Sequence, residues 1–279
     1  MVAEEAQSRF AGRPCKEDRA VLKDCLIVDL GLLGYAEAWA LQKRMVAARK
    51  AGAIGDVLLI CEHPHVITLG QNGKREHLLA SENVLRQKGV EFCETDRGGD
   101  ITYHGPGQIV GYPILDLGAI RRDVHWYVRM LEEVMIRTTA EFGVSAHREM
   151  GKTGIWVKSE DKEITQRPPR AQSSQSEEDA AEKLGAIGVH ISRWVTSHGF
   201  AYNVATDLRY FDLIVPCGIA ERKATSLEKI LGRSVKKEEV SPVLAKHFGE
   251  VFGLEMNQAP RTELMERLAA VELRETVPA

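Results

Sequence analysis

Short apolar runs alternate with amphipathic stretches along most of this chain, and that alternation narrows the folds open to it more than any other feature. Apolar runs of β-strand length lie at residues 26–30, 57–61, 66–69, 90–92, 101–103, 108–117, 186–191 and 199–204. Helical spacing of apolar residues appears at 35–50, 76–88, 124–142, 240–251 and 262–273. Strands interspersed with helices indicate an α/β or α+β fold. Because only residues 62–65 separate two of the strands, we expect those two to be neighbours around a turn.

The same pattern indicates one domain. No linker rich in Pro, Gly and Ser divides the apolar segments, so we expect a single domain over residues 24–279. With 279 residues and 44% hydrophobic content, the chain can bury a core large enough to be stable without disulfide bonds or bound metal ions. Residues 1–23 are charged and lack periodicity, which indicates a loosely ordered N-terminal extension. Residues at about 158–182 are too polar to pack, and we expect a mobile surface insertion there.

Charge and cysteine usage exclude several classes of protein. A formal net charge of -3 argues against a nucleic-acid binder, whose domain would be strongly basic. The cysteines are odd in number, scattered and without a C-x-x-C pair, which argues against a disulfide framework and a zinc site. Residues 1–20 contain no apolar run of the kind that a signal peptide or membrane span needs. We therefore expect a cytoplasmic protein without membrane contact.

The segment Arg97 to Gln108, RGGDITYHGPGQ, carries the densest functional signal. Its four glycines permit positive φ and let the backbone approach a ligand closely, while Arg97, Tyr103 and His104 supply polar groups. The alternative is a glycine-rich turn between two strands. Because Arg, Tyr and His are unusual in a plain hairpin, we favour a substrate-binding loop.

Cys217 lies between Pro216 and Gly218, directly after an apolar run. A cysteine on such a rigid, open turn can expose its sulfur, and backbone N–H groups nearby can face a developing oxyanion. The alternative is that a free cysteine is a small buried hydrophobe, and we keep that interpretation for Cys61 and Cys93 in their strand-like runs.

Two further residues are candidates for acting on a thiol. Lys183 precedes an apolar, glycine-spaced strand, where its positive charge could stabilise a thiolate. The alternative is a solvated lysine that ends the polar insertion, and from the residues alone we favour that alternative. His198 comes just before a strand and could pair with Cys217, although a single histidine there is more often structural. The spacing in the sequence does not decide between the two roles of His198.

Other common chemistries lack their motifs. Gly70 to Lys74 has neither the spacing nor the hydroxyl residue of a phosphate-binding loop. The chain contains no H-E-x-x-H or equivalent metal-ligand spacing, so we expect no metal site.

Four segments taken together and in order resemble the lipoyl(octanoyl) transferase family. They are RGGDITYHGPGQ at 97–108, KLGAIGV at 183–189, HGFAYNV at 198–204 and DLRYFDLIVPCGI at 207–219. The resemblance spans roughly residues 25–254.

The resemblance implies a fold and a set of site residues. The fold would be that of biotin and lipoate protein ligases, a mixed β-sheet flanked by helices. Cys217 would carry the acyl group and Lys183 would lower its pKa, with His198 as an additional candidate. The acyl chain would be bound by Arg97, Gly98, Gly99, Asp100, Ile101, Thr102, Tyr103, His104, Ala186, Ile187, Gly188, Gly199, Phe200 and Ala201.

The resemblance also implies a reaction and its partners. The enzyme would move an octanoyl group from acyl carrier protein, through a cysteine thioester, to a lysine of a lipoyl domain. Acceptors would be the lipoyl domains of 2-oxoacid dehydrogenase complexes and the glycine cleavage H protein. Because an amide is more stable than a thioester, neither ATP nor another cofactor would be needed. The alternatives are an ATP-dependent lipoate or biotin ligase of the same fold and a non-catalytic module that binds acylated proteins.

Overall fold

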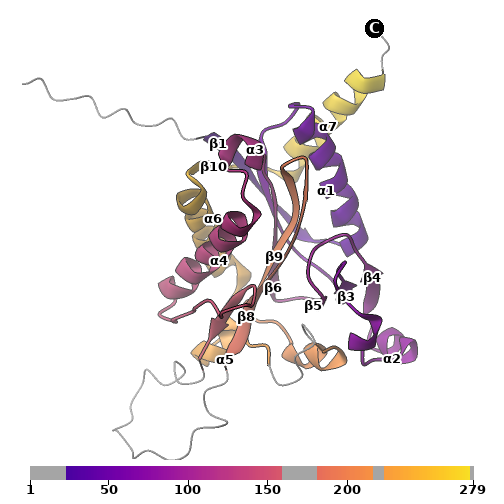
Figure 1. Ribbon diagram of the computed structural model, residues 1–279, viewed down its shortest axis with the longest axis vertical. Coiled ribbons are helices and arrows are strands. Elements are labelled where there is room, and N and C mark those ends of the chain that lie inside the picture. Colours follow the sequence, from indigo (N-terminus) through magenta and orange to yellow (C-terminus); the bar gives the residue numbers. More distant parts are fainter. Residues whose placement is uncertain (1–22, 159–180, 216–222, 277–279) are drawn as a thin grey trace, which may run out of the picture.

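The computed structural model describes residues 23–158, 181–215 and 223–276 (Figure 1). Its strands are β1 Lys23–Leu32, β2 Asp56–Glu62, β3 Val66–Leu69, β4 Glu91–Glu94, β5 Ile101–His104, β6 Gln108–Ile114, β7 Ile155–Val157, β8 Glu182–Ser192, β9 Val195–Asn203 and β10 Leu254–Gln258. Its α-helices are α1 Tyr35–Lys50, α2 Glu82–Gln87, α3 Leu117–Ile120, α4 Val124–Glu141, α5 Leu227–Leu231, α6 Lys237–Phe252 and α7 Arg261–Thr276. Two 3-10 helices are η1 Arg75–His77 and η3 Leu208–Leu213.

Seven of the strands form one large sheet in the order β10-β1-β2-β6-β9-β8-β7. The β10–β1 and β1–β2 pairs are parallel, and the remaining pairs are antiparallel. The sheet is therefore mixed, which confirms the fold class that the sequence implied.

Helices cover both faces of this sheet (Figure 1). In β2, Leu58 and Ile60 face a core completed by α4, α5 and α6, whereas Val57 and Leu59 face a core completed by α1 and α7. Successive side chains of a strand point to opposite faces, so a strand covered on both sides must be apolar at nearly every position. The buried run of β2 meets that requirement.

The second sheet is small, with strand order β4-β3-β5. It corrects the expectation that the strands at 57–61 and 66–69 are neighbours, because β2 pairs with β1 and β6 while β3 pairs with β4 and β5. The connection between them contains His63, whose ring is buried against the Leu33 carbonyl oxygen at 2.6 Å and the Tyr112 hydroxyl at 2.7 Å. This connection anchors the chain to the large sheet and then leads it into the small one.

Two predicted elements have different bounds. The helix expected over 76–88 is divided into η1 and α2, because Ser81 caps α2 by accepting from the Val84 N–H at 3.4 Å. The strand expected over 108–117 ends at Ile114. Leu117 instead begins α3, because Asp116 accepts from the Gly118 N–H at 2.8 Å and so starts the helical turn.

The predicted extension and insertion fall largely outside the described residues. Lys23 already belongs to β1. Lys158 and Ala181 to Glu182 are described, and Glu182 begins β8 by pairing with Val157 of β7. The chain therefore leaves the large sheet at Val157 and rejoins it at the directly opposite position.

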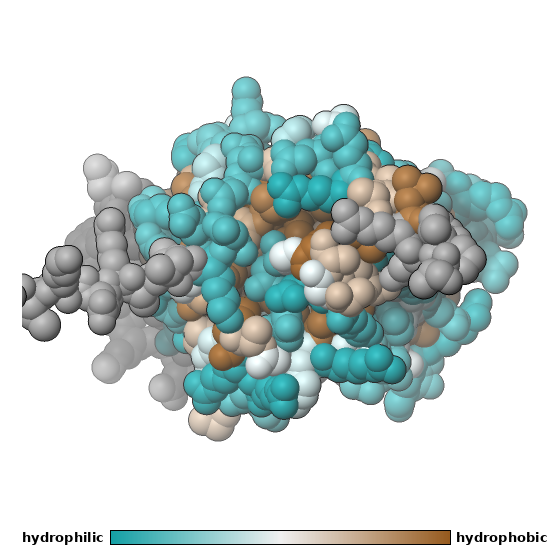
Figure 2. Space-filling view, turned by 90° about the horizontal axis from the view of Figure 1, so that it is seen from above, coloured by the Kyte–Doolittle hydropathy of each residue, from teal (hydrophilic) through white to brown (hydrophobic). Residues whose placement is uncertain are grey.

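The view from above shows a mainly hydrophilic border, with hydrophobic residues in the middle of the face (Figure 2). This distribution fits helices that turn their polar sides outward. Among the described helices, none has both the length and the apolar character needed to cross a membrane.

Candidate active site

A cavity of about 420 Å³ lies between the glycine-rich segment and the β8–β9 pair. Its walls include Arg97, Gly98, Gly99, Asp100, Ile101, Thr102, His104, Lys183, Ala186, Ile187, Gly188, His198, Gly199, Phe200 and Ala201. The three segments that the sequence singled out thus surround one space, although they lie far apart along the chain. A volume of this size is within the usual range for small-molecule sites.

Tyr103 is the one described acyl-binding candidate that does not line the cavity. It is fully buried in the core of the small sheet, where its ring stacks on Tyr210 with centroids 5.1 Å apart. Side chains alternate along β5, so Thr102 and His104 can line the cavity while Tyr103 packs behind it.

The glycine-rich segment packs directly on the backbone of β8. The Gly98 N–H donates to the Val189 carbonyl oxygen at 2.9 Å. A Cβ at Gly188 would lie 2.9 Å from the Gly98 carbonyl oxygen, too close for any side chain. Gly99 has a φ of 87°, which favours glycine. The alternative of a plain glycine-rich turn holds only for Gly105 to Gly107, which connect β5 to β6, because Gly98 precedes β5 and packs against β8.

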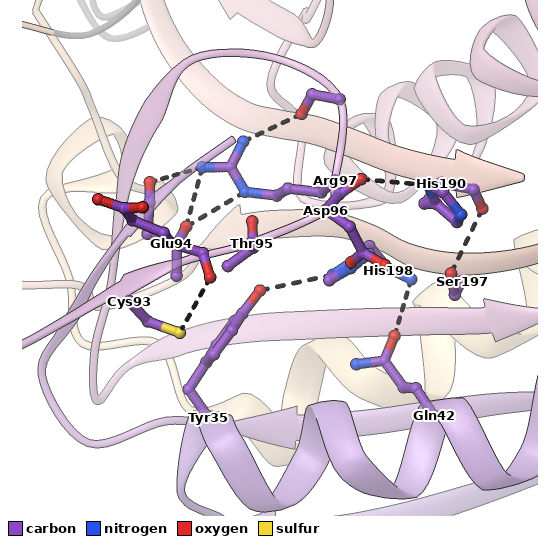
Figure 3. A network of polar contacts seen from close by, with 12 residues as sticks. Tyr35, Gln42, Cys93, Glu94, Thr95, Asp96, Arg97, His190, Ser197 and His198 are labelled. Atoms are coloured by element: carbon purple, nitrogen blue, oxygen red, sulfur yellow. Dashed lines mark hydrogen bonds and ion pairs between the residues drawn. The ribbon is translucent and has the colours of Figure 1, made fainter. Parts of the chain in front are cut away.

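Arg97 fastens this segment to β3. Its Nη2 atom donates to the carbonyl oxygen and the hydroxyl of Thr68 at 2.7 and 2.8 Å, and Nη1 donates to the Gly98 carbonyl oxygen at 3.0 Å. The arginine is buried, with 6% of its surface exposed. These bonds hold the guanidinium against Thr68 and the backbone of Gly98, so Arg97 shapes the cavity wall (Figure 3).

His198 occupies a network behind the glycine-rich segment (Figure 3). Its Nε2 lies 2.7 Å from Asp96 Oδ1 and its Nδ1 lies 3.4 Å from the Tyr35 hydroxyl. Its backbone N–H donates to Gln42 Oε1 at 2.7 Å, and its φ is 53°. Burial lowers the pKa of His198, although Asp96 opposes the change. These bonds hold the ring against Asp96 at the edge of the cavity.

Lys183 lines the cavity from β8 and is half-buried, which is contrary to the alternative of a solvated lysine. Its Nζ lies 5.2 Å from the centroid of the Trp156 ring, within the range of a cation–π contact. Lys183 lies six positions before Val189, the partner of His198, which corresponds to about 20 Å of extended strand. Lys183 and His198 therefore stand near opposite ends of the strand pair.

The backbone of Lys183 is joined to the chain that follows Cys217. Its N–H donates to the Lys223 carbonyl oxygen and its carbonyl oxygen accepts from the Thr225 N–H, both at 2.9 Å. Lys223 and Ala224 also line the cavity. Cys217 itself lies outside the described residues, as does Cys15.

The other three cysteines are poor nucleophiles. Cys25 and Cys61 are fully buried, and burial raises the pKa of both thiols well above the usual range. Cys93 is half-buried, and its pKa is also raised by burial. A thiol with a raised pKa forms little thiolate at neutral pH. The buried interpretation is confirmed for Cys61 and holds only in part for Cys93.

The cavity also has walls that the sequence analysis did not assign. They include Tyr35, Gln108, Tyr112, Trp156 and Asn203. Gln108 is the last residue of one quoted motif and Asn203 lies within another, so a polar residue at the boundary of an apolar run was the available signal. Tyr35 and Trp156 had no such signal. Among the described residues, no group of three His, Cys, Asp or Glu side chains could hold a metal ion.

Comparison with known proteins finds likeness in sequence both to a family and to individual proteins. Residues 34–249 match the family described as lipoyl protein ligase A/B catalytic domain. The octanoyltransferase of Solibacter usitatus is 46% identical over 235 residues, covering 84% of this chain and 96% of that protein. The octanoyltransferase of Acidobacterium capsulatum is 49% identical over 236 residues, covering 81% and 89%.

Solved structures resemble this one in fold. A bipartite lipoate protein ligase from Thermoplasma acidophilum superposes with a TM-score of 0.65 at 16% identity, covering 91% of this chain and 93% of that one. A lipoate-protein ligase A solved with ATP gives a TM-score of 0.63 at 16% identity, covering 91% and 95%. These likenesses confirm the expected fold.

Proposed function

The chain belongs to the lipoyl protein ligase A/B catalytic-domain family, and we propose that it transfers an octanoyl group from octanoyl-acyl carrier protein to a lysine ε-amine of a lipoyl domain. Its relatives of 42 to 49% identity are octanoyltransferases, and the chain is a transferase enzyme. The donor, the acceptor and the cysteine chemistry are our proposal. So are the cytoplasmic location and the independence from a cofactor.

The observation that carries the proposal is the position of Lys183. It lines the same cavity as the glycine-rich segment, and its backbone is bonded to residues 223–225, which follow the segment that contains Cys217. An acyl chain needs an apolar cavity with a reactive group at one end, and Val110, Ile187 and Phe200 supply apolar wall.

In the first half of the proposed reaction, the Cys217 thiolate attacks the carbonyl carbon of the octanoyl thioester. A new carbon–sulfur bond forms, the bond to the carrier's sulfur breaks, and the carrier's thiolate takes a proton from the Lys183 ammonium and leaves as a thiol. The Lys183 ammonium favours the charged thiolate and so increases the nucleophile available at neutral pH. One thioester replaces another, so the step is nearly isoenergetic.

In the second half, the ε-amine of the acceptor lysine attacks the Cys217 thioester. A carbon–nitrogen bond forms, the bond to Cys217 breaks, and the amine loses a proton to Lys183. Acylation removes the thiolate that held Lys183 charged, which makes its neutral, proton-accepting form accessible. The acceptors that we propose are lipoyl domains of 2-oxoacid dehydrogenase complexes and the glycine cleavage H protein.

Intact mass spectrometry tests the proposal. Mixed with octanoyl-acyl carrier protein alone, the enzyme should gain the mass of one octanoyl group, and peptide mapping should locate it on Cys217. Cys217→Ala should gain nothing, whereas Cys93→Ala, the matched control, should still be acylated. An adduct on Cys61 or Cys93, or full activity of Cys217→Ala, would refute the nucleophile.

The same assay separates the alternative reactions. An ATP-dependent ligase would acylate the lipoyl domain when it is given free octanoate and ATP without carrier protein. A non-catalytic module would leave the lipoyl domain unmodified with either donor. Our proposal expects modification with the carrier-linked donor alone.

A further inference from the structure

A chain of hydrogen bonds determines which ring nitrogen of His104 carries the proton. The chain starts at the Thr225 carbonyl oxygen, which can only accept and lies 2.9 Å from Asn203 Nδ2. The Asn203 amide is therefore oriented with Oδ1 as its acceptor. Gln108 Nε2 donates to that atom at 2.8 Å and to the Tyr103 carbonyl oxygen at 3.3 Å. Two acceptors thus fix the orientation of the Gln108 amide.

The orientation of Gln108 decides the tautomer of His104. Gln108 Oε1, which can only accept, lies 2.7 Å from His104 Nδ1, so Nδ1 must carry a hydrogen and donate. In a neutral imidazole, Nε2 then keeps its lone pair. Because the ring lines the cavity, Nε2 is the acceptor that it can offer to a ligand there.

The surroundings keep this ring uncharged. Burial lowers the pKa of His104 to about 3, and the neighbouring His63 and Arg97 act in the same direction. An uncharged acceptor can bind an N–H group without adding a positive charge that would repel an incoming lysine. His104 is therefore suited to orienting an amine, and its low basicity leaves removal of the proton to Lys183.

The network also ties His104 to the strand of Lys183. The Thr225 N–H donates to the Lys183 carbonyl oxygen at 2.9 Å, and the Thr225 carbonyl oxygen starts the chain that ends at His104. The side chains of His104 and Lys183 both line the cavity. The same hydrogen-bond network therefore holds the acceptor His104 Nε2 and the proton-accepting amine of Lys183.

We propose that Gln108 and Asn203 are positioning residues that fix the Nδ1–H tautomer of His104, so that Nε2 accepts a hydrogen bond from the lysine amine attacking the acyl group. This role rests on the proposed function, because that reaction brings an amine to the cavity. The tautomer itself does not depend on the reaction.

Nitrogen-15 NMR of histidine-labelled, full-length protein tests the tautomer first. The ring signals of His104, assigned by their loss in His104→Asn, should show protonated Nδ1 and unprotonated Nε2 at neutral pH. Gln108→Met, of similar size but without the amide, should shift the signals toward the Nε2–H form. Gln42→Met is the matched control, since Gln42 accepts from the His198 backbone, and it should leave the His104 signals in place. An Nε2–H ring in the parent protein would overturn the proposal.

Rates of the two half-reactions test the role. Gln108→Met should lower the ratio of aminolysis rate to acylation rate about tenfold, which corresponds to the loss of one hydrogen bond in the transition state. His104→Asn can still donate to Gln108 but has no Nε2, so it tests the same loss and should give the same result. An unchanged ratio in a folded His104→Asn protein would overturn the role. If the parent protein formed no acyl-enzyme, the proposed function and this role would both fail, whereas the NMR result would stand.

Discussion

At the scale of single residues, Lys183 is the side chain whose removal should be most informative. In Lys183→Ala, the pH midpoint for alkylation of Cys217 by iodoacetamide should rise, because the positive charge that favours the thiolate is gone. Acyl transfer should slow by about 10² to 10⁴ if the lysine also accepts the proton. The alkylation rate measured against pH, and turnover with the carrier-linked donor, check the two effects separately.

Lys183→Arg separates charge from proton transfer. Arginine keeps the positive charge but does not give up its proton, so the alkylation midpoint should stay low while amide formation is lost. If Lys183→Ala changed neither the midpoint nor the turnover, Lys183 would have no role in the chemistry and His198 would become the leading candidate for activating Cys217.

The sequence anticipated the residues of the site better than their orientations. The glycine-rich segment was identified because unusual residue types stand close together there, whereas Lys183 was identified through the family resemblance. The sequence could not show that Tyr103 turns away from the cavity. That orientation depends on which side of β5 packs into the core of the small sheet. The bonds of Gln108 and Asn203 join atoms 95 residues apart, and no local pattern reports such a contact.

At the scale of elements, the close approach of β9 and β6 depends on Gly199. A Cβ there would collide with the Gly111 carbonyl oxygen and lie 2.7 Å from Pro113 Cδ. Gly199→Ala should therefore lower the free energy of unfolding by about 1 to 3 kcal/mol, since neither neighbour is a flexible side chain. Urea denaturation measures the loss. Gly55→Ala is the control, because an added Cβ meets nothing within 4 Å and should change stability little.

The pairing of β7 with β8 makes a second prediction for an element. Val157 and Glu182 are directly opposite each other, so a short turn can join the strands when residues 160–179 are removed. The shortened protein should keep its melting temperature and its turnover. A collapse of turnover at an unchanged melting temperature would instead assign those residues a part in substrate docking or closure.

Elements defined by local pattern were predicted well, and their pairing was not. The expected helix at 35–50 matches α1, and the expected strand at 66–69 matches β3. The partners of β3 are instead set by the buried bonds of His63 and by strands that follow later in the chain. Adjacency in sequence therefore gave the wrong neighbour for β2.

At the scale of the whole molecule, the mixed sheet with helices on both faces followed from the family resemblance, whereas its second sheet did not. The cavity needs both sheets, because β5 supplies one wall and β8 with β9 supplies the other. His63, His104 and His198 are all buried, and burial lowers the pKa of each.

These buried histidines should make the folded state sensitive to acid. Their folded-state pKa values lie below the unfolded value of about 6.5. As the pH falls through that value, the unfolded chain therefore binds more protons than the folded chain, and the free energy of unfolding falls. His104, with a pKa of about 3, should alone remove about 2 kcal/mol of unfolding free energy between pH 7 and pH 5. Asp96, whose pKa is held below its usual value by His198 despite burial, loses its contribution only at lower pH. Urea denaturation at the two pH values measures the loss, and His104→Asn should reduce it by that amount. An equal loss in His104→Asn would mean that the acid sensitivity comes from other groups.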